Sequence, residues 1–286
     1  MQFHSPGTVD EAVSMLASAE GTSRVLAGGT DLLVQLRSGM VEPDVIVDLK
    51  RIEELRTITE EGGGFRIGAA VSCTELGEHG KLAQAWPGVV EAARLIGSEQ
   101  IQSRSSLGGN ICNASPAADT VPALIAARAV CSLAGPDGRR DVPVEDIATG
   151  PGKTCLSRGE FVVSLLLPKR PARAADAYLR FIPRTEMDIA VVGAGISLVL
   201  DRSGKVEEAH AGLGAVAPKA LLVPEIAQAL VGTTCNEDAL EAAAAAARAA
   251  CRPIDDKRGT VDYRTRVAGV LTKRAAQAAY ERAQAK

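Results

Sequence analysis

The sequence has few residues of the types that usually carry hydrolytic or acid–base chemistry. Aromatic residues make up 3% of its 286 positions, and there are three histidines. His4, His79 and His210 do not stand beside a nucleophile or a second ligand in the sequence, and no G-x-S-x-G elbow occurs. Side-chain catalysis of that kind is therefore not indicated.

Targeting signals and long apolar runs are also lacking. No apolar run reaches the ~18 residues that a membrane-spanning helix requires. The first residues, "MQFHSPGTVDEAV", have neither the basic start nor the apolar centre of a secretory signal. We therefore expect a cytoplasmic protein with no membrane span.

Cysteine spacing and charge exclude two further classes of site. The six cysteines contain no C-x-x-C pair, so we expect no zinc or iron–sulfur site built by this chain: Cys73, Cys112, Cys131, Cys155, Cys235 and Cys251. Thirty-two basic and 35 acidic residues give a net charge of -3 without a basic run. A nucleic-acid partner is not indicated, and small molecules or proteins are the expected partners.

The first 50 residues predict a β-α-β unit. "TVDEAVSMLAS" begins on a capping residue and has helical spacing, and the short strand "RVLA" follows it. "DLLVQLRSG" predicts a helix that stops at Gly39, and "DVIVDL" a buried strand. One apolar stripe of this second helix would hold Leu32, Leu33, Leu36 and Met40.

The middle of the chain alternates regular and irregular segments. "FRIGAA" predicts a strand, "CTELGEHGKLAQ" a capped helix, and "GVVEAARLIG" a helix ending on glycine. "SEQIQSRSSLGGNICNASPAAD" has neither helical nor strand periodicity, so we expect a long loop and a helix only after Asp119. A loop of this length inside a compact domain is usually functional.

The remaining segments predict antiparallel strands followed by helices. "AVCSLAGPDGRRDVPVEDI" is typical of a hairpin, and "EFVVSLLLP" of a buried strand that ends at Pro168. "KRPARAAD" is expected to be a linker. "YLRFIPR", "IAVVGAGISLVLD" and "KVEEAHAGLGAV" predict three strands, the last two joined at "RSGK", and the alanine-rich run 241–250 a helix.

Paired glycines between a strand and a helix suggest a phosphate site. In "AGGTDL" unpaired N–H groups and the positive end of a helix dipole would face one spot, and glycine would let a ligand approach the backbone. The alternative is an ordinary tight turn in which Thr30 or Asp31 caps the helix. The motif is not a P-loop, because G-K-[ST] is absent. It also departs from G-x-G-x-x-G, although Asp48 ends the next strand where a Rossmann fold has its ribose-binding acid.

A second loop of the same kind strengthens this interpretation. "SSLGGN" again pairs glycines with small and hydrogen-bonding residues, and "NASPAAD" adds Asn113, Ser115 and Asp119. Two such loops can grip one long ligand. A dinucleotide needs backbone donors for its pyrophosphate and side-chain partners for its hydroxyls.

Taken together, "AGGTDL", "SLGGN", "CNASPAAD" and "RTEMDIAVV" resemble the FAD-binding medium subunit of molybdenum hydroxylases. This is the flavoprotein subunit family of xanthine dehydrogenase, carbon monoxide dehydrogenase and 4-hydroxybenzoyl-CoA reductase. The resemblance implies an α+β fold with a two-part FAD-binding domain of the PCMH (vanillyl-alcohol-oxidase-like) type over 1–170, with subdomains of about 1–58 and 59–170. A smaller C-terminal α+β domain, with an antiparallel sheet and helices, would span 175–286.

The resemblance also assigns cofactor contacts by position. The two loops would surround the pyrophosphate. Asp119 would bind flavin or ribityl groups, and Asn113 and Ser115 would lie beside the cofactor. Val162 and Ile96 would contact its rings. Arg180 stands where many relatives have a Lys close to the flavin, and a cation there would favour the reduced flavin. The alternative is that Arg180 and Arg184 simply lie on the solvent-exposed face of a strand. The two loops comprise Leu26, Ala27, Gly28, Gly29, Thr30, Asp31, Leu32 and Leu33, and then Ser106, Leu107, Gly108, Gly109 and Asn110.

The implied function is electron transfer within a heterotrimer. FAD would pass electrons from two [2Fe-2S] clusters of a small subunit to an acceptor such as NAD or oxygen, while a large molybdopterin subunit oxidises the substrate. The complex would be a dimer of heterotrimers. The branch with an additional iron–sulfur insertion is not indicated, because nothing between Pro122 and Pro168 resembles that insertion. The alternatives are a self-sufficient FAD-dependent reductase of the same fold and a non-redox nucleotide-binding module.

Overall fold

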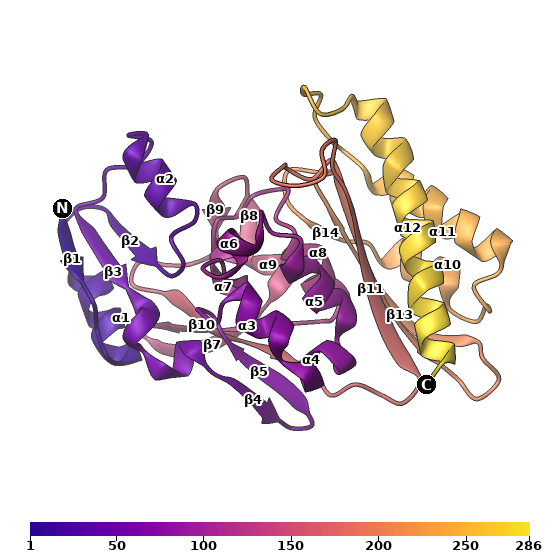
Figure 1. Ribbon diagram of the computed structural model, residues 1–286, viewed down its shortest axis with the longest axis horizontal. Helices are drawn as coiled ribbons and strands as arrows, with labels where there is room; N and C mark the ends of the chain where they lie inside the picture. The colour runs from indigo at the N-terminus through magenta and orange to yellow at the C-terminus, as the bar shows by residue number, and fades with distance from the viewer.

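The computed structural model describes all 286 residues, which form three main β-sheets with helices around them. Figure 1 shows these units in chain order along the long axis, from the N-terminal sheet to the C-terminal helices. Three separate clusters of buried apolar side chains form the cores. The α+β fold expected from the sequence is confirmed.

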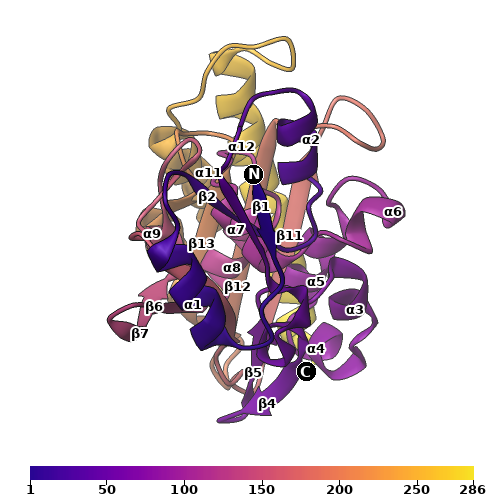
Figure 2. The ribbon, with the colours of Figure 1, turned by 90° about the vertical axis from the view of Figure 1, so that its left-hand side faces the viewer.

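The N-terminal unit is the β-α-β arrangement that the sequence predicts. Its three strands are parallel and lie in the order β1-β3-β2. Figure 2 shows α1 alongside these strands and α2 at their upper end. The strands are β1 (Gln2–His4), β2 (Ser23–Leu26) and β3 (Val45–Asp48), and the helices are α1 (Val9–Ser18) and α2 (Leu32–Arg37).

The two helices of this unit differ in burial. Helix α1 begins at its Thr8 cap and buries Ala12 and Leu16 against the sheet. Helix α2 has no buried residue, and Leu33 and Met40 are 46% and 74% exposed. The expected apolar stripe of α2 is therefore not buried against the sheet.

The second sheet is antiparallel, with strand order β4-β5-β10-β6-β7. The predicted hairpin and buried strand are both present. Strand β4 was not predicted, because "ITEE" has only one apolar residue, and it pairs at the sheet edge through a turn at Gly62 and Gly63. The strands are β4 (Ile58–Glu61), β5 (Gly64–Gly68), β6 (Val130–Gly135), β7 (Gly138–Pro143) and β10 (Phe161–Leu167).

Short helices accompany this sheet and correct two expectations. The single helix expected over "CTELGEHGKLAQ" is broken at His79, whose ring accepts the Leu82 N–H and so caps a second helix. The long segment expected to be irregular contains α6 and α7, which are too short for periodicity to reveal. The helices are α3 (Cys73–Glu78), α4 (Gly80–Ala85), α5 (Pro87–Arg94), α6 (Glu99–Gln102), α7 (Leu107–Cys112), α8 (Thr120–Ala126) and α9 (Val144–Ile147).

Four smaller elements complete this part of the chain. Two 3-10 turns follow β3, and a short hairpin precedes β10. They are η1 (Leu49–Arg51), η2 (Glu53–Arg56), β8 (Ala148–Gly150) and β9 (Lys153–Thr154).

The C-terminal unit has an antiparallel sheet between two helical layers. Figure 1 shows α5 and α8 on one side of the sheet and α10 to α12 on the other. No helix is both long and apolar enough to cross a membrane. The elements are β11 (Ala174–Phe181), β12 (Val192–Leu200), β13 (Val206–Gly214), β14 (Leu221–Leu222), α10 (Pro224–Leu230), α11 (Glu237–Ala250) and α12 (Val261–Gln284).

Three glycines in the C-terminal sheet allow α8 to pack very close to the strands. A Cβ added at Gly195 or Gly212 would lie 2.6 or 2.3 Å from the carbonyl oxygen of Pro122, and one at Gly214 would lie 2.7 Å from its ring. Only glycine leaves this space free. Helix α8 therefore seats directly on β12 and β13.

The expected linker "KRPARAAD" is instead partly buried. Strand β11 begins within it, and Arg170 forms an ion pair with Asp176 at 2.8 Å with both side chains almost fully covered. The Arg170 guanidinium also lies 4.0 Å from the centre of the Trp86 ring. This segment is a packed joint between the two halves of the chain.

Candidate functional site

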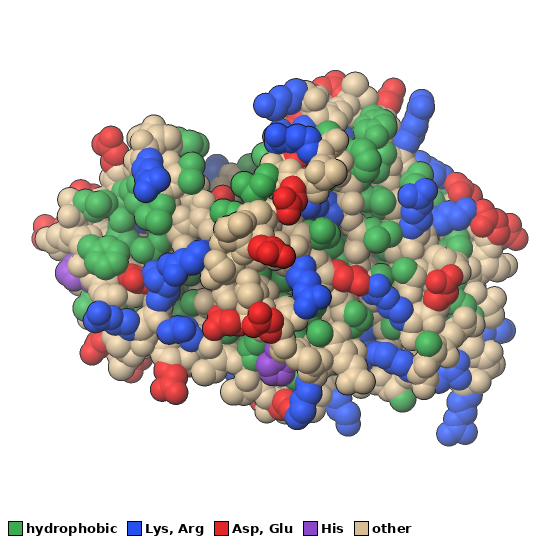
Figure 3. Space-filling model, viewed as in Figure 1, with side chains coloured by type: hydrophobic (Ala, Val, Ile, Leu, Met, Phe, Trp, Pro, Cys, Tyr) green, Lys and Arg blue, Asp and Glu red, His purple; other side chains and the backbone are tan.

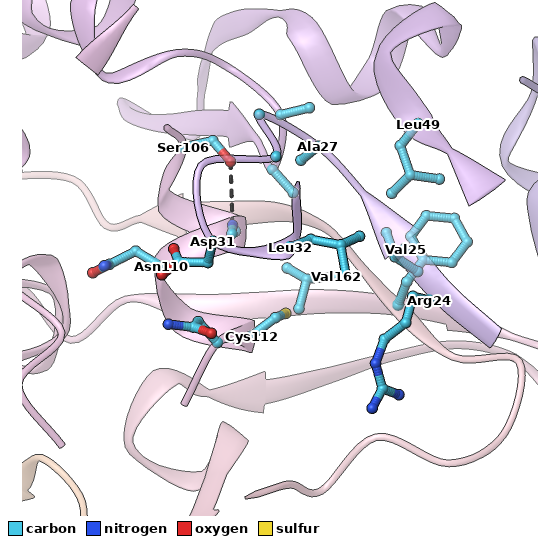
Figure 4. Close-up of a pocket in the computed structure, with 18 of the residues that line it drawn as sticks. Arg24, Val25, Ala27, Asp31, Leu32, Leu49, Ser106, Asn110, Cys112 and Val162 are labelled. Atoms are coloured by element: carbon cyan, nitrogen blue, oxygen red, sulfur yellow. Dashed lines mark hydrogen bonds between the residues drawn. The ribbon is translucent and has the colours of Figure 1, made fainter. Parts of the chain in front are cut away.

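A cavity of about 520 Å³ lies where the two glycine loops face each other. Ala27 to Leu32 form one part of its wall, and Ser106, Gly108, Gly109, Asn110 and Asn113 form another. Figure 4 shows these two walls approaching from separate parts of the chain. The two loops that the sequence predicts to grip one ligand therefore line the same cavity.

The first loop presents unused hydrogen-bond donors. None of the N–H groups of residues 28–32 donates to an acceptor within the chain. Asp31 occupies the N-cap position of α2 without a side-chain capping bond, and its carboxylate lines the cavity, where burial raises its pKa. The capped-turn alternative therefore lacks the capping bond it requires, and the free N–H groups remain available to an anion.

Gly28 is needed for a different reason from the one expected. A Cβ added to Gly28 would lie 1.7 Å from the carbonyl oxygen of Arg104. The close approach that excludes a side chain is thus between the loop and the segment before α7, and not only between the loop and a ligand. Gly29 has a φ of +78°, which favours glycine at the turn.

The second loop is held more rigidly. Ser106 caps α7 by accepting the Gly109 N–H at 3.2 Å, the bond drawn in Figure 4. The side-chain amide oxygen Oδ1 of Asn110 accepts from the backbone N–H and the hydroxyl of Thr120 at 3.1 and 2.7 Å. This arrangement leaves the side-chain nitrogen Nδ2 of Asn110 free to donate into the cavity.

One end of the cavity is apolar, which sequence reasoning did not reveal. Val25, Leu49 and Phe161 line it together with Leu55. Arg24, whose guanidinium donates to the Ser23 carbonyl oxygen and forms no ion pair, lies beside them. Figure 4 shows Arg24, Val25 and Leu49 grouped on the side away from Asn110. These residues come from three distant segments, so no local pattern could have identified them. Of the expected ring contacts, Ile96 and Val162 do line the cavity.

Six of the expected contacts do not lie on the cavity wall. Leu26 and Leu107 are buried in the protein, Leu33 is exposed, and the Ser115 hydroxyl accepts the Ala117 N–H. The other two, Asp119 and Arg180, bind each other. The six are Leu26, Leu33, Leu107, Ser115, Asp119 and Arg180.

Asp119 and Arg180 form an ion pair that joins the two halves of the chain. The Arg180 guanidinium donates to Asp119 at 3.0 Å and to the carbonyl of Leu95 at 2.7 Å, and its side chain is only 4% exposed. Arg180 is therefore not on a solvated strand face, whereas Arg184 is 68% exposed. The second oxygen of Asp119 and the hydroxyl of Tyr178 are buried without a partner.

Burial of Asp119 should make stability depend on pH. Desolvation raises the pKa of Asp119 to about 6, although the charge of Arg180 opposes the shift. Because the folded-state pKa lies above the unfolded one, the stability from this group is present below about pH 4 and is lost as pH rises through 6. We expect the loss to be on the order of 2 kcal/mol.

Urea unfolding of the wild type and Asp119→Asn at about pH 5 and about pH 7 measures this effect. The asparagine keeps an acceptor for Arg180 but does not titrate. The wild type should lose more unfolding free energy than the variant between the two pH values, and equal losses would contradict the assignment.

The chain does not assemble a metal site from its own side chains. No group of three or more His, Cys, Asp or Glu side chains comes together in a way that could hold a metal ion, and all six cysteines are free. Figure 3 shows acidic and basic side chains interspersed over one face, which is notched at its upper edge.

This fold, with two glycine loops on one elongated cavity, is that of an FAD-binding oxidoreductase subunit. Residues 1–170 match the family described as the FAD binding domain in molybdopterin dehydrogenase, and 177–279 match the CO dehydrogenase flavoprotein C-terminal domain. The chain belongs to this family.

Similar proteins cover almost the whole chain. The carbon monoxide dehydrogenase medium chain of Hydrogenophaga pseudoflava is 36% identical over 282 residues, 98% of this chain and 97% of that protein. The xanthine dehydrogenase FAD-binding subunit of Escherichia coli O157:H7 is 31% identical and covers 95% of this chain and 93% of its own. A solved structure of reconstituted CO dehydrogenase from Oligotropha carboxidovorans has a TM-score of 0.95 at 33% identity, covering 99% and 98%.

Proposed function

We propose that this chain is the FAD-binding electron-transfer subunit of a heterotrimeric molybdenum hydroxylase. Its partners would be a large molybdopterin-binding subunit and a small subunit with two [2Fe-2S] clusters, assembled as a dimer of heterotrimers. Electrons would reach this chain from the small subunit and leave to an acceptor such as NAD or oxygen. When bound, FAD supplies the electron-carrying chemistry that side chains lack.

The observation that carries the proposal is the row of free N–H groups at residues 28–32 beside the cavity. A pyrophosphate is a dianion that several convergent N–H donors can bind. The Asn110 amide can donate to a phosphate or hydroxyl oxygen, and Ile96 and Val162 give apolar surface for a ring. The residues present therefore fit FAD.

We propose that the residues expected from the family act on FAD in two ways. The cavity-lining loop residues are proposed to bind FAD directly. Asp119 and Arg180 are proposed to act from behind the wall, since Arg180 donates to the carbonyl of Leu95, the neighbour of Ile96. Their joint charge is close to neutral while Asp119 is ionised, which would limit the effect of Arg180 on a flavin.

We also infer a division into an FAD-binding domain over 1–170, with subdomains of about 1–58 and 59–170, and a C-terminal domain over 175–286. The three sheets and three apolar clusters support this division. A cytoplasmic location is supported by six free cysteines, because such thiols are typical of a reducing compartment.

A self-sufficient reductase would need a proton donor aimed into the cavity. Of the two carboxylic acids on the wall, Glu160 is held by Arg140 and its pKa falls to about 2, so it stays ionised. The other, Asp31, sits on the loop proposed to bind phosphate. No observation therefore favours the reductase over the electron-transfer subunit.

Titration of the deflavinated chain with FAD tests the proposal. We expect one FAD per chain, a yellow complex, and competition by ADP, because ADP contains the pyrophosphate that the loops would hold. Binding of ADP without FAD would support a non-redox nucleotide-binding module. Binding of neither would overturn the assignment of the cavity.

A further inference from the structure

The first glycine loop is tied to an ion pair on the next strand. The ammonium group of Lys50 donates to Asp48 at 2.6 Å and to the carbonyl oxygen of Ala27 at 3.1 Å. Asp48 also accepts the backbone N–H of Lys50 at 3.1 Å. The three groups thus form a closed link between β3 and the residue that precedes Gly28.

This link fixes the direction of a peptide group at the start of the phosphate loop. In a trans peptide the C=O and N–H bonds lie in one plane and point in opposite directions. Because Lys50 binds the Ala27 carbonyl oxygen, the N–H of Gly28 in the same peptide group must point away from Lys50. Gly28 lines the cavity, and its N–H has no acceptor in the chain.

The link also explains what Asp48 does. A ribose-binding acid would have to face the ligand, but Asp48 does not line the cavity, its side chain is only 13% exposed, and one of its oxygens takes both bonds from Lys50. Leu26 and Asp48 are paired in the parallel sheet, so the link begins at the carboxyl ends of β2 and β3. Asp48 therefore orients Lys50 rather than a ligand.

We propose that Lys50, held by Asp48, is a positioning residue that preorganises the first loop for the pyrophosphate of FAD. This inference rests on the proposed function. Lys50 does not line the cavity, so it acts through the Ala27 carbonyl. Its charge is largely balanced by Asp48, and the main effect is on the orientation of the Gly28 N–H.

Substitutions at Lys50 distinguish an effect on loop position from a general effect on protein stability. Lys50→Met keeps the length of the side chain but removes both hydrogen bonds, and it should weaken binding of FAD and of ADP in parallel by about tenfold. Lys50→Arg keeps the charge and the donors and should restore most of the affinity. The control is Lys81→Met, which removes a 73% exposed cation from an ion pair with Glu60 on α4 and β4.

Dissociation constants for FAD and ADP, with thermal unfolding of each apo variant, decide between the outcomes. Equal affinities of wild type and Lys50→Met, or an equal loss in Lys50→Met and Lys50→Arg, would overturn the positioning role. If Lys50→Met binds FAD weakly only because it is unfolded, Lys50→Gln at lower temperature provides the comparison, and unchanged affinity there also overturns the role. Failure of the wild type to bind FAD and ADP would instead overturn the proposed function.

Discussion

Gly109→Val should abolish stoichiometric FAD binding while leaving the protein folded. Gly109 lies in α7 on the cavity wall, and a Cβ added there would meet only the Ser106 hydroxyl, at 3.3 Å. The valine methyl groups would therefore project into the space that the cofactor needs. A steric penalty on the order of 3 kcal/mol corresponds to a roughly 100-fold rise in the dissociation constant.

Two other glycines provide the comparison. Gly80 starts α4 with nothing within 4 Å of an added Cβ, so Gly80→Val should leave both fold and FAD binding unchanged. Gly28→Val should damage the protein itself, because the Arg104 carbonyl occupies the space of its side chain. Far-ultraviolet circular dichroism and FAD titration of the three variants separate loss of the ligand from loss of structure. Full FAD binding by Gly109→Val would show that the second loop is not at the cofactor.

The isolated chain should carry electrons but oxidise no organic substrate. Loaded with FAD, it should bleach with a chemical reductant and recover its colour with an added acceptor. Oxidation of a purine, an aldehyde, an N-heterocycle or carbon monoxide would need an activated metal-bound oxygen and a path through iron–sulfur clusters. The six cysteines are scattered over the chain, and no side-chain group suited to a metal forms.

Reconstitution of the chain with its two proposed partner subunits tests this prediction. Turnover should be undetectable for the single chain and should appear only after the molybdopterin and iron–sulfur subunits are added, since the proposed division of labour places the substrate pocket elsewhere. Metal analysis of the purified chain serves as the control. Turnover of any of these substrates by the chain alone, free of molybdenum and iron, would favour a self-sufficient flavoenzyme.

Local signals in the sequence predicted most elements of the fold correctly. The β-α-β start, the hairpin around "GPDG" and the three long strands of the C-terminal sheet have clear periodicity and turn residues, and the structure contains each of them. Elements with weak local signals were missed. Strand β4 forms because β5 offers it a partner, and α6 and α7 are too short to show a helical period.

The functional site could be predicted only in part, because some of its contacts join segments that are far apart in the sequence. Both glycine loops have recognisable sequences, and they do meet at the cavity. Contacts between distant segments have no recognisable sequence pattern. Arg180 pairs with Asp119 across 61 positions, and the Arg104 carbonyl oxygen occupies the space that a side chain at residue 28 would need. The partners of these residues follow from tertiary packing, which no local pattern in the sequence reveals.

The seating of α8 on the C-terminal sheet has a consequence for how this protein can vary. Pro122 fills the space over Gly195, Gly212 and Gly214, so a larger side chain at any of the three collides with the same ring or carbonyl. Changes at these four positions cannot have additive effects, because each determines what the others tolerate. A substitution on α8 at Pro122 is therefore expected to require matching changes on β12 and β13, although these segments are far apart in the sequence.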